Sequence, residues 1–347
     1  MTTPLDRHDV LLADLDGTLY RGAEAVPGAV EAVAAAREQG VTTMYVTNNA
    51  SRRPVDVATH LAELGFPAGE RDVVASSQAA AAMLVAQLPA GAAVLVVGTD
   101  ALVEEVVRVG LTVTADAAEA VAVVQGHSPD TGWRVLAEAT VALRAGAVWV
   151  ACNVDPTLPT ERGPLPGNGS MVAALRTASD REPQVAGKPA PALLHEAAGR
   201  VGATNPLMIG DRLDTDVEGG RAAGMTTLLV LTGVSDAAEL LAAPEALRPD
   251  LVGADMAALH RPVDELAPGP RPGWEARTVE PGVLELSGDG DALDALRALC
   301  AAHWAAGGGG FRISPTGEGA VRALDELGLR PATVAGADTP DPAGARP

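Results

Sequence analysis

One stretch near the N-terminus, Val10–Tyr20 (VLLADLDGTLY), constrains the fold more than any other part of the chain. It begins with uninterrupted apolar residues, and two aspartates, Asp14 and Asp16, follow before a glycine. An unbroken apolar run that ends at turn residues is typical of a strand buried on both faces, as in a parallel sheet. Open α/β sheets bind ligands at the carboxyl ends of their strands. The stretch therefore predicts a ligand site at the end of this strand.

The two aspartates indicate a divalent cation. Asp14 and Asp16 are two positions apart, so a continued strand would point both side chains to the same side. Two carboxylates this close repel each other unless a cation lies between them. Hard oxygen ligands are those that magnesium prefers in proteins, and we therefore expect Mg²⁺ as the cofactor.

Composition narrows the class of protein. The chain has 347 residues, 47% hydrophobic and only 2% aromatic, so we expect a core of Ala, Val and Leu. The formal net charge of −20 and the lack of clustered basic residues argue against a nucleic-acid partner. We find neither an apolar leader nor an uncharged apolar run of about 18 residues, and expect no membrane partner. The two cysteines, Cys152 and Cys300, have no metal-site spacing and favour a reduced, cytoplasmic protein.

Strands and helices alternate through most of the chain, which predicts a parallel α/β sheet with right-handed crossovers. One loop, residues 153–169, is long and rich in Pro and Gly, and loops of this length are often functional. After residue 262 the pattern changes. We expect a linker over residues 263–273, a small α+β appendage over 274–334 and a disordered tail over 335–347.

Polar residues follow three of the predicted strands, and one lysine lies in a Gly-Lys-Pro segment between them. Phosphoryl transfer needs a nucleophile, a proton-transfer group, a divalent cation and fixed positive charge around the phosphate. The four segments can supply each of these parts. Their polar residues are Asp14 and Asp16, Thr47 and Asn48, Lys188, and Asp211 with Asp214 and Asp216.

These segments resemble, in the same order, the four motifs of the haloacid dehalogenase superfamily. The residues that carry the resemblance are DLDGT at Asp14–Thr18, Thr47, Lys188 and GDRLDTD at Gly210–Asp216. The chain between Thr47 and Lys188 resembles the large α/β cap of the branch that includes nitrophenyl and phosphoglycolate phosphatases. The resemblance covers about residues 8–260. It implies a Rossmann-like parallel-sheet core over residues 1–78 and 185–262, with an inserted α/β cap domain over 79–184.

The resemblance also implies roles for the first and fourth motifs. Asp14 would be the nucleophile that forms an aspartyl-phosphate. Asp16 would protonate the leaving alcohol and then take a proton from the hydrolytic water. Mg²⁺ would be held by Asp14, the backbone carbonyl of Asp16, and Asp211.

The other motifs would bind the phosphate. Thr47 would donate its hydroxyl and Asn48 its backbone amide, while Lys188 would neutralise charge on the nucleophile and the phosphate. Asp216 would support the metal-bound waters or Lys188. Asn49 has two interpretations, as a cap of the next helix or as a substrate contact.

The long loop adds two further candidates. Asn153 and Asp155 lie at its start, and either could contact the substrate if the loop faces the site.

We therefore expect a cytoplasmic, Mg²⁺-dependent phosphatase that acts on a small phosphorylated metabolite. The capped core with a C-terminal α+β appendage looks most like bacterial glycerol 3-phosphate phosphatases, which implies that substrate. Phosphoglycolate, nitrophenyl, nucleotide and sugar phosphates remain alternatives, as does a phosphomutase. A catalytically idle ligand-binding protein on this scaffold also stays open, as does a C-terminal part that transfers acyl groups. A homodimer formed through the cap would suit this type of protein.

Overall fold

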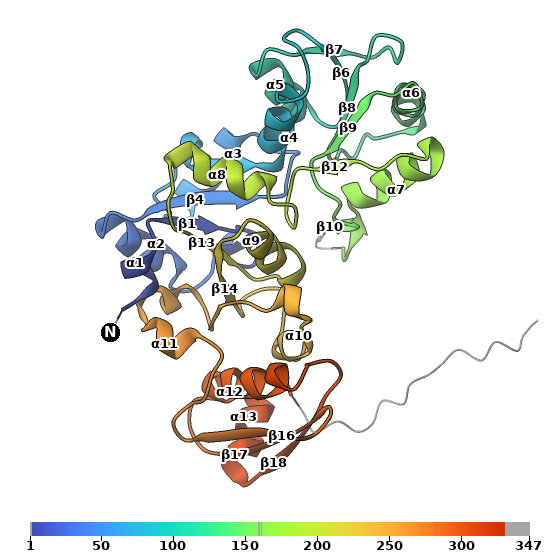
Figure 1. The fold of residues 1–347 in the computed structure, drawn as a ribbon. Coiled ribbons are helices and arrows are strands. Elements are labelled where there is room, and N and C mark those ends of the chain that lie inside the picture. The colour runs from blue at the N-terminus through green and yellow to red at the C-terminus, as the bar shows by residue number, and fades with distance from the viewer. Residues whose placement is uncertain (1, 159, 161, 330–347) are drawn as a thin grey trace, which may run out of the picture. The chain divides into compact units, whose positions relative to one another are not determined.

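The computed structural model describes residues 2–158, 160 and 162–329, and Figure 1 shows its fold. These residues form two compact units. The first contains the chain up to Ser235 together with Ala246–Ala267, and the second contains Asp236–Glu245 together with the chain from Pro268. The residues of the four motifs, together with Asn49, Asn153 and Asp155, lie in the first unit.

A six-stranded parallel sheet forms the centre of the first unit, with strand order β15-β14-β13-β1-β4-β5. Its strands are β1 (Val10–Ala13), β4 (Thr42–Thr47), β5 (Val73–Ala75), β13 (Pro206–Gly210), β14 (Thr226–Val230) and β15 (Leu251–Gly253). Strand β1 pairs with β13 on one side and with β4 on the other. The carboxyl ends of these three neighbours therefore meet at one edge of the sheet, and the predicted parallel α/β core is confirmed.

Strand β1 is buried on both faces, as the apolar run predicts. Leu11 and Ala13 belong to one hydrophobic cluster, whereas Val10 and Leu12 belong to another. Helices contribute to these clusters from both faces of the sheet. They are α2 (Ala29–Glu38), α3 (Pro54–Glu63), α4 (Ser76–Val85) and α8 (Ala192–Val201).

A second parallel sheet, with order β12-β9-β8-β6-β7, forms the inserted domain. Its strands are β6 (Ala93–Val97), β7 (Thr112–Thr114), β8 (Ala122–Gln125), β9 (Val148–Ala151) and β12 (Gln184–Val185), and its helices are α5 (Asp100–Arg108), α6 (Trp133–Arg144) and α7 (Asn168–Ser179). The expected boundaries at 78/79 and 184/185 fall inside α4 and β12. Short strands such as β12 join a sheet through distant partners, which local periodicity does not reveal.

Two short hairpins add to this framework. The first, β2 (Tyr20–Arg21) with β3 (Glu24–Ala25), directly follows the first motif. The second, β10 (Thr157–Leu158) with β11 (Leu165–Pro166), lies within the segment 153–169 that the sequence predicts as a loop. That segment is therefore more regular than expected.

The end of the first unit differs from the expected linker. Helix α11 (Val263–Leu266) occupies the start of residues 263–273, and its Val263 and Leu266 belong to the hydrophobic core. Two apolar residues three positions apart lie on the same face of a helix, which explains why this short segment packs. The smaller elements of the first unit are α1 (Pro4–Arg7), η1 (Glu70–Asp72), η2 (Leu213–Val217), α9 (Glu218–Ala222) and η4 (Met256–His260).

The second unit contains a three-stranded sheet, β16 (Trp274–Glu280), β17 (Val283–Gly288) and β18 (Arg312–Thr316), with helices α12 (Ala292–Ala305) and α13 (Glu318–Glu326). Helix α10 (Ala237–Ala242) belongs to this unit rather than to the core assigned from the sequence, and Trp304 Nε1 donates to Leu241 O at 3.2 Å. Residues 330–334 of the expected appendage and the expected tail over 335–347 lie outside the described residues. Among the described helices, none combines the length and apolarity needed to span a membrane.

Candidate active site

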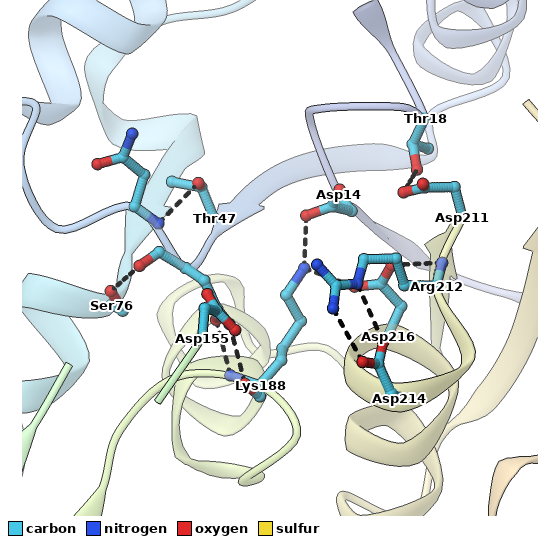
Figure 2. Close-up of polar contacts among 12 residues, drawn as sticks. Asp14, Thr18, Thr47, Ser76, Asp155, Lys188, Asp211, Arg212, Asp214 and Asp216 are labelled. Atoms are coloured by element: carbon cyan, nitrogen blue, oxygen red, sulfur yellow. Dashed lines mark hydrogen bonds and ion pairs between the residues drawn. The ribbon is translucent and has the colours of Figure 1, made fainter. Parts of the chain in front are cut away.

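The parallel sheet brings the four sequence motifs to one place (Figure 2). Asp14 follows β1, Thr47 ends β4 and Asp211 follows β13. Lys188 comes from the segment after β12, and its Nζ donates to Asp14 Oδ1 at 2.6 Å and to Asp216 Oδ1 at 2.7 Å. The Lys188 and Asp216 side chains are each 2% exposed, against 15% for Asp14. A buried ammonium thus connects the first and fourth motifs.

The pKa values of the ionisable side chains in this cluster are shifted from their ordinary values. Burial raises the pKa of Asp14, Lys188 lowers it, and the carboxylates of Asp216 and Asp211 raise it again, with an upward net shift. Burial lowers the pKa of Lys188, but Asp14 and Asp216 outweigh this effect, so the lysine stays charged. Burial, followed by the charge of Asp216, raises the pKa of Asp211 to about 6. The cluster therefore carries more negative charge than one ammonium balances.

A divalent cation fits this excess of carboxylates. Asp14, Asp211 and Asp216 each offer an oxygen within 4.8 Å of the others. Both oxygens of Asp216 already accept protein hydrogen bonds, from Lys188 and, at 3.1 Å, from the N–H of Arg212. Asp14 Oδ2 accepts no hydrogen bond within the described residues, and Asp211 Oδ1 accepts only the Thr18 hydroxyl, at a long 3.3 Å. Asp14 and Asp211 are thus the better candidates for direct metal ligands, and hard carboxylate oxygens suit Mg²⁺.

The protein also fixes the orientation of Asp211. Its Oδ2 accepts the N–H of Val234 at 2.7 Å, and Thr18 Oγ donates to Oδ1 at 3.3 Å. A Cβ on Gly233 would lie 1.9 Å from Asp211 Oδ2, and one on Gly17 would lie 2.5 Å from the same oxygen. The Asp211 carboxylate can therefore lie this close to the backbone at positions 17 and 233 only because both residues are glycines. Gly233 lies outside the four motifs, and nothing in the sequence pattern points to it.

Asp16 occupies the turn between β1 and the first hairpin, and its side chain is exposed. Neighbouring protein atoms nevertheless displace part of the water around the carboxylate, and this desolvation raises the pKa of Asp16. The nearby charge of Arg52 opposes the rise. Within the described residues the Asp16 carboxylate has no hydrogen bond or ion pair, which leaves it available to exchange a proton. The ring of His60 packs edge-on against Tyr20 at 5.0 Å and so holds the hairpin that follows Asp16.

The loop after β4 is held by its own side chains. Thr47 Oγ accepts the N–H of Asn49 at 3.1 Å, which leaves the hydroxyl hydrogen free to donate. Asn49 Oδ1 accepts the N–H and the hydroxyl of Ser51 at 2.9 and 2.7 Å. Asn49 is therefore not the cap of the next helix, because Arg53 is the N-cap of α3. Its side-chain oxygen stabilises the loop itself.

Asn48 links the core to the inserted domain. Its side chain bonds to the backbone of Lys188, and its Nδ2 also donates to Asp155 Oδ2 at 3.3 Å. Asn153 Nδ2 donates to the backbone oxygen of Asn48 at 2.7 Å. The structure thus places both candidates from the long segment next to the second motif.

The fourth motif contains one further ion pair. Arg212 forms two parallel bonds with Asp214, Nε to Oδ1 at 3.0 Å and Nη2 to Oδ2 at 2.8 Å. This pairing explains the position of Asp214, which lies outside the cluster around Lys188.

Three family models match the chain. A haloacid dehalogenase-like hydrolase model matches residues 11–112, and a second HAD-hydrolase-like model matches residues 185–259. A model of a GCN5-related N-acetyltransferase-like domain matches residues 271–329, within the second unit. The two hydrolase models flank the inserted domain, as expected for a core that an insertion divides.

Known proteins with similar sequences and structures agree with these matches. A D-glycerol 3-phosphate phosphatase from Mycobacterium tuberculosis is 50% identical over 316 residues, 88% of each chain. Crystal structures of a glycerol phosphate phosphatase from the same organism, in complex with calcium and with magnesium, superpose with TM-scores of 0.90 and 0.88 at 48% and 49% identity. They cover 94% and 95% of this chain and 99% of theirs.

A 4-nitrophenylphosphatase from Thermotoga maritima superposes with a TM-score of 0.69 at 29% identity and covers 75% of this chain and 99% of its own. The chain is therefore also similar in structure to a nitrophenyl phosphatase, the type of enzyme that its motifs and its inserted domain resemble. The chain belongs to the haloacid dehalogenase-like hydrolases.

Proposed function

We propose that this protein is a Mg²⁺-dependent phosphatase that hydrolyses glycerol 3-phosphate to glycerol and phosphate. The observation that carries the reaction is the buried ammonium of Lys188 between Asp14 and Asp216, next to Asp211. The choice of substrate rests on the similarity, over most of the chain, to glycerol 3-phosphate phosphatases.

In the first step, a carboxylate oxygen of Asp14 attacks the phosphorus atom while the bond from phosphorus to the glycerol oxygen breaks. Lys188 occupies Asp14 Oδ1, so Oδ2 is the oxygen available for attack. Asp16 gives its proton to the leaving glycerol oxygen, a role that suits a carboxylic acid of raised pKa. The products are glycerol and an aspartyl-phosphate on Asp14.

In the second step, water attacks the phosphorus of the aspartyl-phosphate and Asp16 takes up the proton of that water. The bond between phosphorus and the Asp14 oxygen breaks, so phosphate leaves and the Asp14 carboxylate is restored. Asp16 returns to its protonated form, and the cycle balances.

The phosphate is held by positive charge and by hydrogen-bond donors. Thr47 donates through its hydroxyl, Asn48 through its backbone N–H, and Lys188 through its charge. When it is held by Asp14, the backbone carbonyl of Asp16 and Asp211, Mg²⁺ would balance the carboxylates and attract the anionic substrate. Asp216 keeps Lys188 directed at Asp14.

Phosphate release from a set of phosphomonoesters tests this proposal. The set contains glycerol 3-phosphate, phosphoglycolate, pyridoxal phosphate, nucleoside monophosphates and sugar phosphates, each measured with Mg²⁺ and with excess EDTA. We expect the highest kcat/KM for glycerol 3-phosphate and no turnover in EDTA. A higher kcat/KM for another ester would show that this ester is the preferred substrate. No phosphate release from any of the esters would overturn the proposal that the protein is a phosphatase.

We do not extend the proposal to acyl transfer by the second unit. The diphosphate group of an acyl carrier favours a positive helix N-terminus, whereas α12 and α13 have Asp294 and Glu318 in their first turns. Helix α13 begins at Gly317 without a side-chain cap, and α12 begins with Asp291 as its N-cap. Asp291 accepts the N–H of Asp294 at 3.0 Å, so a carboxylate already occupies this position.

We also propose a reducing, cytoplasmic location. Cys152 is a buried free thiol, which suits a reducing compartment.

We also propose a homodimer formed through the inserted domain. Helix α6 of the inserted domain exposes Trp133 (81%) and Val141 (57%), a surface that a second copy could cover. Sedimentation of the wild-type protein and of Trp133→Glu tests the dimer, and a wild-type monomer would contradict it.

A further inference from the structure

We propose that Asn153 and Asp155, which belong to the inserted domain, are positioning residues that act on the phosphate through Asn48. This inference rests on the proposed function and deepens it, because it says how the inserted domain contributes to the phosphate site. It also changes the role of both residues from substrate contacts to supports of the second motif.

The side chain of Asn48 fixes the backbone at Lys188. Its Oδ1 accepts the N–H of Lys188 at 2.8 Å, and its Nδ2 donates to the carbonyl of the same residue at 2.9 Å. Two opposed bonds to one residue define the plane of the amide and the position of the lysine backbone. A Cβ on Gly187 would lie 2.5 Å from Asn48 Oδ1, so the preceding residue must be a glycine for this contact to form.

The inserted domain binds the remaining polar atoms of Asn48. Its Nδ2 also donates to Asp155, at 3.3 Å to Oδ2 and 3.5 Å to Oδ1. Asn153 Nδ2 donates to the Asn48 carbonyl at 2.7 Å, and Ser76 Oγ donates to the same oxygen at 2.6 Å. The backbone N–H of Asn48 has no acceptor within the described residues. It is thus the group left for the phosphate, and the other bonds fix its direction.

The segment that makes these contacts is itself held firmly. Asn153 is 5% exposed, and its Oδ1 accepts the N–H of Asp155 at 3.3 Å. Asn168, at the start of α7, donates to the Asn153 carbonyl at 2.7 Å and is 2% exposed. Both groups of the Asn153 amide therefore have protein partners. The position of the inserted sheet is transmitted to Asn48 through this segment.

The chain of contacts predicts a property that a substrate contact would not have. Asn48 touches the phosphate, which all phosphomonoesters share, and not the alcohol group. Removing the side chain of Asp155 or Asn153 should therefore lower kcat/KM for every phosphomonoester by a similar factor. It should also weaken the binding of inorganic phosphate. If these residues contacted the glycerol hydroxyls directly, their removal would instead lower kcat/KM for glycerol 3-phosphate alone.

The test compares the wild type with Asp155→Ala, Asp155→Asn and Asn153→Leu. Kinetics are measured with glycerol 3-phosphate and with p-nitrophenyl phosphate, and binding of inorganic phosphate to the Mg²⁺-loaded protein is measured by calorimetry. Glu182→Ala is the matched control, because it removes an exposed carboxylate of the same domain whose side chain pairs with Arg176. Circular dichroism and melting temperature identify any variant that fails to fold.

We expect kcat/KM to fall by roughly 10- to 100-fold for both esters in Asp155→Ala and Asn153→Leu, with their ratio unchanged. The Kd for inorganic phosphate should rise by about tenfold, an effect that a merely smaller folded fraction would not produce. Asp155→Asn keeps an acceptor oxygen and should recover most of the loss, and the control should match the wild type.

Two results would overturn the inference. One is a loss confined to glycerol 3-phosphate, which would make these residues substrate contacts. The other is an unchanged phosphate Kd in folded Asp155→Ala and Asn153→Leu. A wild type that releases no phosphate from either ester would overturn the proposed function instead, and the phosphate Kd would still decide the positioning role.

Discussion

Lys188 and Asp216 form an enclosed ion pair, with Nζ 2.7 Å from Oδ1 and both side chains 2% exposed. A buried ion pair adds little net stability, since desolvation offsets much of the attraction, but losing one partner leaves an uncompensated charge. The pair therefore serves to hold the ammonium against Asp14, 2.6 Å away, rather than to stabilise the fold.

Lys188→Met should abolish activity and lower the free energy of unfolding by about 3–5 kcal/mol, because Asp14 and Asp216 then lose their common partner. Lys188→Met/Asp216→Asn should recover part of that stability without activity, since one buried charge is removed. Urea unfolding and phosphate release measure the two effects. An active double variant would contradict the role given to Lys188.

Asp14→Asn should reduce turnover by at least about 10³-fold, because a neutral amide is a poor nucleophile and does not form the aspartyl-phosphate, which is an acyl phosphate. Stability should be retained or rise, since the substitution keeps the size of the side chain and removes one of several crowded carboxylates. The measurement is single-turnover phosphate release together with a melting curve. Substantial activity in a folded variant would show that another residue is the nucleophile.

Thermal stability should depend on pH and Mg²⁺ through Asp211. Burial and Asp216 raise its pKa to about 6 in the metal-free protein. A folded-state pKa above the unfolded value means that the folded protein binds more protons, so this group's contribution to stability falls as pH rises from about 4 to 6. Mg²⁺ binds the ionised carboxylate, so its stabilisation should be larger at pH 7.5 than at pH 5.

Differential scanning fluorimetry with and without Mg²⁺ at both pH values measures this difference. Asp211→Asn is the control and should lose most of the metal-dependent shift at either pH. An equal shift at the two pH values in the wild type would contradict the raised pKa of Asp211, and an unchanged shift in Asp211→Asn would exclude Asp211 as a metal ligand.

Gly233→Ala should impair metal binding, because the new Cβ would lie 1.9 Å from Asp211 Oδ2 and displace that carboxylate. We expect the affinity for Mg²⁺, measured by calorimetry, to fall by about tenfold or more, with activity falling in parallel. Gly199→Ala is the matched control, since it lies in α8 with no heavy atom within 4 Å of the added carbon. It should be neutral or slightly stabilising. Normal Mg²⁺ affinity in Gly233→Ala would show that Asp211 tolerates the displacement.

The sequence by itself determined the parallel core and the residues at its strand ends. The apolar run at Val10–Ala13 favours burial on both faces, as in a central strand of a parallel sheet. Asp14, Thr47 and Asp211 lie at the carboxyl ends of their strands, and parallel strand direction puts such ends at the same edge of the sheet. That the three strands are neighbours is seen in the structure.

The tertiary structure alone decided which groups act on one another within that edge. Asn48 contacts Lys188, 140 positions away, and Asp155, 107 positions away, through side-chain bonds that leave no periodic signal in the chain. The approach of Gly233 to Asp211 and the assignment of α10 to the second unit depend likewise on distant partners. The physical reason is that local patterns reflect burial and backbone preference, whereas hydrogen-bond partners and close contacts are fixed only when distant segments pack.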